Sequence, residues 1–170
     1  MDKKSEFVLR RAEFRDAPEI SDIYNESVAT LATYDLDFET KEMRLHWMVE
    51  HEKAGYPVYV VEDRAGDVLG WSSLTPFNSR KGYCYTVENA VFVLTSQCGK
   101  GVGKMLLLAV ISKAKEMGKH SIIAKIDSTN QASISLHKAL GYEQAGYLKE
   151  AGYKFDGWRD VVILQCQLKK

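Results

Sequence analysis

The spacing of apolar and polar residues divides the chain into short strands and helices. Apolar residues alternate with polar ones, or form short runs, at residues 7–12, 57–62, 68–74, 83–94, 121–126, 143–148 and 161–168, which we predict to be strands. Apolar residues three or four apart predict helices that begin near Asp16, Thr40, Val102 and Asn130. Hairpin strands come first and two strand–helix units follow. We therefore expect an α/β fold with a mixed, mostly antiparallel central sheet flanked by helices.

Composition narrows the possible partners and the compartment. The 170 residues are the usual length of one domain, so we expect a single domain over residues 1–170. Lys and Arg together number 23, as do Asp and Glu, so no net charge attracts nucleic acid or a membrane. The polar start, residues 1–6, does not resemble a signal peptide. Three widely spaced cysteines fit neither a disulfide framework nor a metal site, which favours the cytoplasm and predicts no bound metal.

A glycine-rich loop is the sharpest local motif. Residues 98–104, Cys-Gly-Lys-Gly-Val-Gly-Lys, follow a predicted strand and open a predicted helix. Glycines let the backbone curl until successive N–H groups face one point, and a helix N-terminus adds its positive dipole end. The spacing matches neither a dinucleotide fingerprint nor a P-loop. The loop alone predicts either a phosphate-binding nest or an ordinary tight turn.

The order of the motifs along the chain resembles the GNAT superfamily of acyl-CoA N-acyltransferases. Its members share a strand, a loop with two glycines, a helix, a strand that ends in Asn, and a helix that ends in Gly-Phe/Tyr. This chain has Gly101 and Gly103 after the strand residues 90–93, then Asn130, then Leu-Gly-Tyr at 140–142. The resemblance implies a GNAT-like fold and acetyl-CoA as co-substrate.

A narrower resemblance comes from the block at residues 151–161, Ala-Gly-Tyr-Lys-Phe-Asp-Gly-Trp-Arg-Asp-Val. It resembles the phosphinothricin and methionine sulfoximine acetyltransferases, which often form homodimers. The chain departs from the usual patterns at Cys98, where Arg or Gln is common, at His137, where Tyr is common, and at Asn78, where Lys or Arg is common. The last departure leaves phosphinothricin itself undecided as a substrate.

The resemblance assigns roles to individual positions. Glu88 would be the catalytic base. The coenzyme would contact Val91, Phe92, Val93, Gly99, Lys100, Gly101, Val102, Gly103, Lys104, Asn130 and His137. The acceptor would contact Tyr34, Arg80, Tyr83, Thr86, Tyr153 and Lys154.

Each of these assignments has a purely structural alternative. Glu88 could be a strand carboxylate paired with a neighbouring lysine, and His137 a hydrogen-bonded core histidine. Arg80 could be a solvated loop charge rather than an anchor for a carboxylate or phosphinate. Tyr153 and Lys154 could pack within a β-hairpin rather than form a pocket wall or a dimer contact.

The expected reaction is direct acetyl transfer to the primary amine of a small amino-acid-like molecule. The amine attacks the thioester carbonyl, Glu88 takes the ammonium proton, and no cysteine becomes acylated. The rival acceptors are a protein N-terminus, a polyamine or an antibiotic. A non-catalytic acetyl-CoA-binding module is the other alternative.

Overall fold

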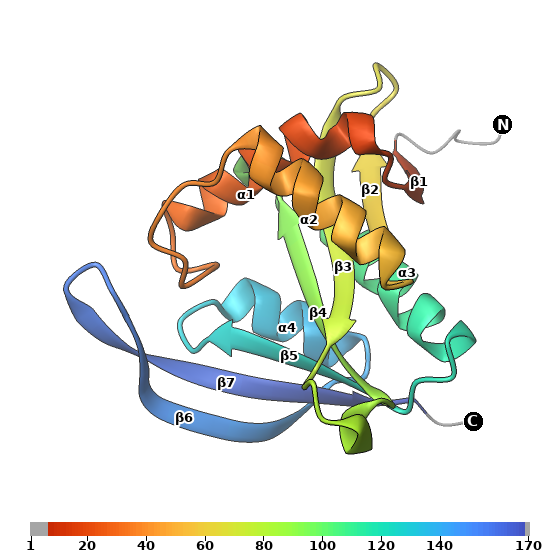
Figure 1. The fold of residues 1–170 in the computed structure, drawn as a ribbon. Coiled ribbons are helices and arrows are strands. Elements are labelled where there is room, and N and C mark those ends of the chain that lie inside the picture. Colours follow the sequence, from red (N-terminus) through yellow and green to blue (C-terminus); the bar gives the residue numbers. More distant parts are fainter. Residues whose placement is uncertain (1–6, 169–170) are drawn as a thin grey trace, which may run out of the picture.

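A computed structural model describes residues 7–168 of the chain. The polar segment 1–6 lies outside the described residues, and so does part of the single domain predicted over residues 1–170. One seven-stranded sheet has the order β1-β2-β3-β4-β5-β7-β6 (Figure 1). The strands are β1 (Val8–Arg11), β2 (Val58–Glu62), β3 (Val68–Pro76), β4 (Thr86–Val93), β5 (Ser121–Asp127), β6 (Glu143–Lys154) and β7 (Gly157–Gln167). Among these seven strands of the described residues, only β4 and β5 pair in parallel. The predicted mixed, mostly antiparallel sheet is confirmed.

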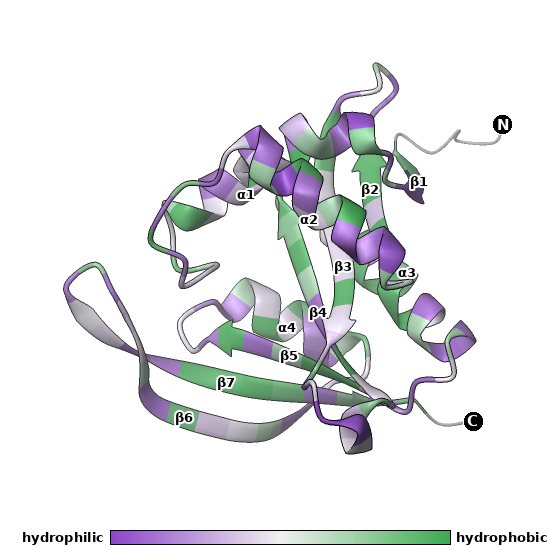
Figure 2. Cartoon of the chain, in the orientation of Figure 1, coloured by the Kyte–Doolittle hydropathy of each residue, from purple (hydrophilic) through white to green (hydrophobic). Residues whose placement is uncertain are grey.

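Helices cover both faces of this sheet. They are α1 (Ala17–Val28), α2 (Lys41–Lys53), α3 (Val102–Glu116) and α4 (Gln131–Ala139), with short 3-10 turns η1 (Phe14–Asp16), η2 (Lys81–Tyr83) and η3 (Thr95–Gln97). One core cluster joins Ile20 of α1 and Met48 of α2 to Trp71 of β3. Another joins Leu106 of α3 to Val61 of β2, whose neighbour Val60 belongs to the first cluster. Successive residues of a strand point to opposite faces, so α3 packs on the face opposite to α1 and α2. Figure 2 shows hydrophobic residues along β2, β4 and β7 and hydrophilic ones on much of α2.

Two strand boundaries and one helix cap in the following comparison differ from the sequence prediction. β4 begins at Thr86 rather than at residue 83, because residues 81–83 form a 3-10 turn in which the Tyr83 N–H donates to the Arg80 carbonyl. β6 extends past residue 148 to Lys154 and forms a long hairpin with β7. Most side chains in this extension are exposed, so backbone pairing rather than an apolar pattern defines it. Asp16 precedes α1, but its carboxylate pairs with Arg10 at 2.7 Å instead of capping that helix.

The parallel pair β4–β5 separates after a short pairing. Residues 86–88 of β4 pair with residues 121–123 of β5, whereas β4 continues to Val93 and β5 to Asp127 without pairing with each other. Figure 1 shows the two strands diverging at this point. The backbone groups along this edge of β4, from residue 89 onward, are therefore free of a β5 partner and face the gap between the strands.

Residues 7–168 lack two features that would point to other classes of site. No helix in this range is long and apolar enough to cross a membrane. No group of three or more His, Cys, Asp and Glu side chains in the same range could hold a metal ion.

Candidate active site

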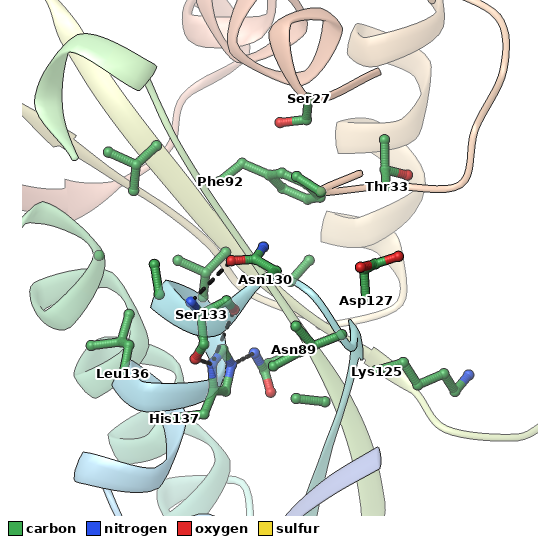
Figure 3. Close-up of a pocket in the computed structure, with 18 of the residues that line it drawn as sticks. Ser27, Thr33, Asn89, Phe92, Lys125, Asp127, Asn130, Ser133, Leu136 and His137 are labelled. Atoms are coloured by element: carbon green, nitrogen blue, oxygen red, sulfur yellow. Dashed lines mark hydrogen bonds between the residues drawn. The ribbon is translucent and has the colours of Figure 1, made fainter. Parts of the chain in front are cut away.

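A cavity of about 760 Å³ lies where β4 and β5 diverge. The first turns of α3 and α4 and the segment between α1 and α2 complete its walls (Figure 3). It is lined by Ser27, Leu31, Ala32, Thr33, Tyr34, Asp35, Glu88, Asn89, Ala90, Val91, Phe92, Val93, Cys98, Gly99, Gly101, Gly103, Lys104, Ala124, Lys125, Ile126, Asp127, Asn130, Ala132, Ser133, Leu136 and His137. Its volume suits a small ligand or part of a larger one.

The glycine loop forms one end of this cavity. Gly99 and Gly101 have φ of 79° and 94°, the left-handed region that glycine adopts without strain. The first hydrogen bond of α3 runs from the Met105 N–H to the Gly101 carbonyl, so the N–H groups of residues 102–104 lack helical acceptors. Lys100 is already engaged, because its N–H and ammonium both donate to Gln97. The free amides at the start of α3 suit a phosphate group.

Glycine at position 103 also permits close packing of α3 on α4. A Cβ at this position would lie 3.2 Å from Leu136 Cδ2 and 3.7 Å from Val93 Cγ2. Because position 103 has no side chain, the backbone of the loop borders the cavity directly at this point. Val102, 1% exposed, instead points into the core.

Asn130 and His137 project from α4 into the opposite wall. Asn130 caps the helix, since its Oδ1 accepts the Ser133 N–H at 3.1 Å, and its amide nitrogen points away from that bond in Figure 3. His137 is 3% exposed, and its Nδ1 lies 2.8 Å from the Ser133 carbonyl. A carbonyl only accepts, so Nδ1 carries the proton, and Nε2 accepts from Asn89 Nδ2 at 3.0 Å.

This hydrogen-bond chain fixes the charge state of His137. Burial disfavours the imidazolium and lowers the pKa of His137, although the bond to the Ser133 carbonyl opposes the shift. The chain continues through Asn89, whose Oδ1 accepts from the Tyr142 hydroxyl at 3.1 Å. Burial raises the pKa of Tyr142. Both rings are therefore neutral near pH 7, and His137 presents an acceptor toward Asn89.

Glu88 and Lys125 form an ion pair on the cavity wall. Glu88 pairs in register with Ile123, and Lys125 is two residues farther along β5, so both side chains leave the same face of the sheet. Lys125 Nζ lies 2.8 Å from Glu88 Oε2, with side-chain exposures of 48% and 28%. The lysine pairing that the structural alternative expects for Glu88 is thus present. Glu88 also lines the cavity.

The segment between α1 and α2 is fastened to the sheet at two points. The Tyr34 hydroxyl donates to Asp127 Oδ2 at 2.6 Å, and the Lys154 ammonium donates to the Thr33 carbonyl at 2.7 Å. The Tyr34 ring lies directly on Gly152, where a Cβ would come within 2.7 Å of it. The segment therefore depends on a glycine in β6 for its position over the cavity.

Local contacts shift the pKa values of the groups that fasten this segment. Burial by itself would raise the pKa of Asp127, but donors from Thr129 and Tyr34 outweigh it and hold the pKa below its usual value. Burial, followed by the bond to Asp127, raises the pKa of Tyr34. Burial also lowers the pKa of Lys154, against the attraction of Asp35. Asp127 is therefore a carboxylate held by neutral donors.

Comparison with known proteins decides the family. A family model described as "Acetyltransferase (GNAT) domain" matches residues 9–163. This match covers most of the chain. The chain belongs to the GNAT acetyltransferase family.

Relatives in this family are named as acetyltransferases of small amino-acid-like molecules. An L-methionine sulfoximine/L-methionine sulfone acetyltransferase of Pseudomonas aeruginosa is 38% identical over 94% of both chains. A phosphinothricin N-acetyltransferase of Alcaligenes faecalis is 37% identical, over 90% of this chain and 78% of the relative. The crystal structure of a phosphinothricin acetyltransferase of Sinorhizobium meliloti in complex with acetyl-CoA has a TM-score of 0.93 and 32% identity over 96% and 89% of the two chains. This protein is therefore an acetyl-CoA-dependent N-acetyltransferase.

The acetyltransferase brings most of the predicted coenzyme residues to one cavity. Those that line it are Val91, Phe92, Val93, Gly99, Gly101, Gly103, Lys104, Asn130 and His137. Lys100 and Val102 do not line it, although their backbone belongs to the same loop. For all eleven residues, contact with the coenzyme stays a prediction.

The predicted acceptor residues are more dispersed. Tyr34 lines the cavity. Lys154 does not, but its ammonium donates to the carbonyl of Thr33, which does. Arg80, Tyr83, Thr86 and Tyr153 do not line it. Arg80 precedes η2, where its N–H donates to Asn78, and Tyr153 is exposed beside Trp158 on the hairpin. For all six predicted residues, a role in acceptor binding stays a prediction.

Sequence reasoning overlooked several polar residues that line the cavity. Among them are Asn89, Lys125, Asp127 and Ser133. The polar run 127–130 directly follows a buried strand, which is a common place for ligand-binding residues and could have signalled Asp127. Lys125 interrupts an otherwise apolar strand, and such an interruption also invites a functional explanation.

Proposed function

We propose that this enzyme transfers the acetyl group of acetyl-CoA directly to the primary amine of a small, amino-acid-like acceptor. Acceptors of the methionine sulfone, methionine sulfoximine and phosphinothricin type fit this class. The observation that carries the proposal is one continuous cavity that includes the glycine loop, the free edge of β4 and Glu88. The names of the relatives support the acceptor class.

The residues on the cavity wall fit acetyl-CoA. Free amides at the start of α3, with Lys104 beside them, would hold the pyrophosphate. Backbone N–H groups between Val91 and Val93 would hold the pantetheine arm and polarise the thioester carbonyl, because β5 leaves that edge unpaired. Asn130 would donate its amide to the arm. When bound, the coenzyme supplies the activated acetyl group, and the protein supplies orientation.

Glu88 would take the proton from the acceptor ammonium, directly or through a water molecule. An ammonium has no lone pair with which to attack, and an α-amino group in a reference peptide titrates near pH 8, so the site must remove a proton at pH 7. Glu88 lines the cavity, and among the described residues no backbone N–H donates a hydrogen bond to its carboxylate. His137 carries its proton on the nitrogen that faces Ser133, so this form does not direct a proton toward Asn89.

Replacing Glu88 with glutamine tests this role. Because Glu88→Gln keeps the shape and removes the base, we expect kcat to fall by about 10²–10⁴-fold with little change in acetyl-CoA affinity. The remaining activity should increase with pH as free amine accumulates. Glu116→Gln is the control, since Glu116 also pairs with a lysine, Lys113, but outside the cavity. Normal turnover by Glu88→Gln at pH 7 would reject Glu88 as the base.

A panel of acceptors tests the substrate class. Release of the CoA thiol would be measured with amino acids, sulfoximines, sulfones, polyamines, peptides and aminoglycosides. Highest kcat/KM with sulfones or sulfoximines supports the proposal, whereas preference for a polyamine or peptide supports another acceptor class. Tight acetyl-CoA binding without turnover of any amine would indicate a non-catalytic binding module.

We also propose a homodimer and a cytoplasmic location. Large apolar side chains on the β6–β7 hairpin are exposed: Tyr147, Leu148, Tyr153, Phe155 and Trp158. Such a group of exposed aromatic residues is typical of a protein interface. The three cysteines are unpaired, which suits a reducing compartment. Light scattering on wild type and Trp158→Ser would test the dimer, and an unchanged monomeric mass for both would reject it.

A further inference from the structure

We call the part of the cavity lined by Tyr34, Asp35, Glu88, Lys125 and Asp127 the acceptor end, and the part at the glycine loop the coenzyme end. The charged side chains at the acceptor end differ in how many hydrogen bonds they form. Asp127 accepts three hydrogen bonds from Thr129 and Tyr34, and Asp35 accepts one from Tyr24. These contacts fix the loops around the cavity. The Glu88–Lys125 pair has another character, because within residues 7–168 each of these two charged groups has the other as its sole ion-pair or hydrogen-bond partner.

This ion pair is suited to open. Both side chains are partly exposed, and an exposed ion pair is weak in water, so separating its members costs little. In the part of the chain that the structure describes, no backbone group forms a hydrogen bond with either charge. Lys125 Nζ also lies 5.9 Å from the centre of the Phe77 ring, which offers the ammonium a second contact when it leaves Glu88. In Figure 3 the Lys125 side chain extends away from Asn130 and His137.

An α-amino acid presents the complementary pair of charges. Its ammonium and carboxylate are attached to one carbon, so they can approach adjacent opposite charges on a protein together. The ammonium would take the place of Lys125 beside Glu88, and the carboxylate would take the place of Glu88 beside Lys125. Each charge in the site keeps an opposite partner throughout this exchange, which avoids leaving an uncompensated charge.

We propose that Lys125 binds the carboxylate of the acceptor and thereby selects α-amino acids over amines that lack this group. This inference rests on the proposed function and adds a specificity-determining residue to it. The exchange would direct the acceptor amine to Glu88, the group proposed to deprotonate it. Lys125 lines the cavity and Arg80 does not, so carboxylate binding is assigned to Lys125 rather than to Arg80.

Two acceptors separate carboxylate recognition from every other effect. They are L-methionine sulfone and its decarboxylated analogue, which keeps the amine and the sulfone. For Lys125→Met we expect KM for methionine sulfone to increase at least about tenfold, which equals about 1.4 kcal/mol, while KM for the analogue and for acetyl-CoA stays unchanged. Lys125→Arg should keep most of the preference, because guanidinium also binds carboxylate.

The control is Lys113→Met, which breaks an exposed lysine–glutamate pair on α3 outside the cavity. It should alter neither KM. An effect of Lys125 exerted only through Glu88 would change kcat for both acceptors alike, so the difference in KM isolates carboxylate binding. Equal changes for both acceptors, or no change in Lys125→Met, would overturn the inference.

The outcome also separates this inference from the proposed function. If wild type acetylates the analogue as well as methionine sulfone, N-acetyltransfer stands and the role of Lys125 is rejected. If wild type acetylates neither, the proposed function fails, and calorimetric titration of methionine sulfone into the CoA-saturated enzyme decides the inference. Weaker binding by Lys125→Met than by wild type supports it, whereas equal binding, or none to either protein, overturns it.

Discussion

Replacing Gly152 with alanine tests whether β6 positions the segment that covers the acceptor end. A Cβ at position 152 would lie 2.7, 2.9 and 3.0 Å from three carbons of the Tyr34 ring. Ordinary contact between carbon atoms is about 3.5–4.0 Å, so the ring must move by roughly 1 Å. The bond from the Tyr34 hydroxyl to Asp127 is 2.6 Å long and would not survive such a shift unaltered.

The expected cost follows from that bond. A hydrogen bond to a charged group contributes about 1.5–3 kcal/mol, so we expect Gly152→Ala to lower the free energy of unfolding by about that amount. KM for the acceptor should increase, because Thr33 and Asp35 line the cavity beside Tyr34. KM for acetyl-CoA should stay near wild type, since the glycine loop is untouched. Tyr34→Phe removes the hydroxyl alone and measures the part due to the hydrogen bond.

Urea unfolding and steady-state kinetics with both substrates measure these effects. Gly146→Ala is the matched control on the same strand, because its Cβ would lie 3.5 Å from Ile163 Cδ1, an ordinary contact. Neither glycine has a positive φ, so backbone strain does not separate the two variants. Equal stability and equal acceptor KM in Gly152→Ala and Gly146→Ala would refute the reasoning.

Three further predictions concern the coenzyme end. Gly103→Asp should weaken acetyl-CoA binding more than about tenfold, because a carboxylate beside the free amides repels phosphate. Gly103→Ala should bind acetyl-CoA much better than Gly103→Asp. Similar affinities of the two variants, measured by calorimetry, would reject the phosphate site. Cys98→Ser should keep substantial turnover, since direct transfer uses no thiol, and mass spectrometry should find no acetylated cysteine; an acetyl-thioester trapped during turnover would contradict direct transfer. Burial lowers the pKa of His137 from its usual value of 6.5. When the pH falls below 6.5, His137 therefore becomes protonated in the unfolded chain while it stays neutral in the folded chain. The stabilisation is therefore complete above pH 6.5 and lost as pH falls from there toward the lowered value, by up to about 1.4 kcal/mol per pH unit. Urea unfolding of His137→Gln should show a shallower loss of stability in this window, and parallel pH profiles for the two proteins would count against a buried neutral histidine.

The coenzyme end could be predicted from the sequence because local backbone geometry builds it. Glycines at positions 99, 101 and 103 act through backbone conformation and close packing, which depend on residues nearby in the chain. The cap formed by Asn130 on α4 is local in the same way. Such features are visible in a short stretch of sequence, and the family resemblance then supplied their meaning.

Long-range pairing explains why the acceptor end was harder to predict. Tyr34 and Asp127 are 93 residues apart in the chain, and Lys154 and Thr33 are 121 residues apart. No local pattern indicates that these side chains meet. The extension of β6 had the same cause, because its exposed side chains lack a regular alternation and only pairing with β7 defines the strand.

This difference in construction has a consequence for specificity. Backbone amides bind the parts of a coenzyme that every reaction shares, and a change of side chain leaves them in place. The acceptor end uses side chains from the α1–α2 segment, β4, β5 and β6, so one substitution can alter its charge without altering the fold. Lys125 is such a position, because β5 pairs through its backbone whatever side chain stands there. Acceptor preference should therefore depend on a few charged positions set on a common coenzyme-binding frame.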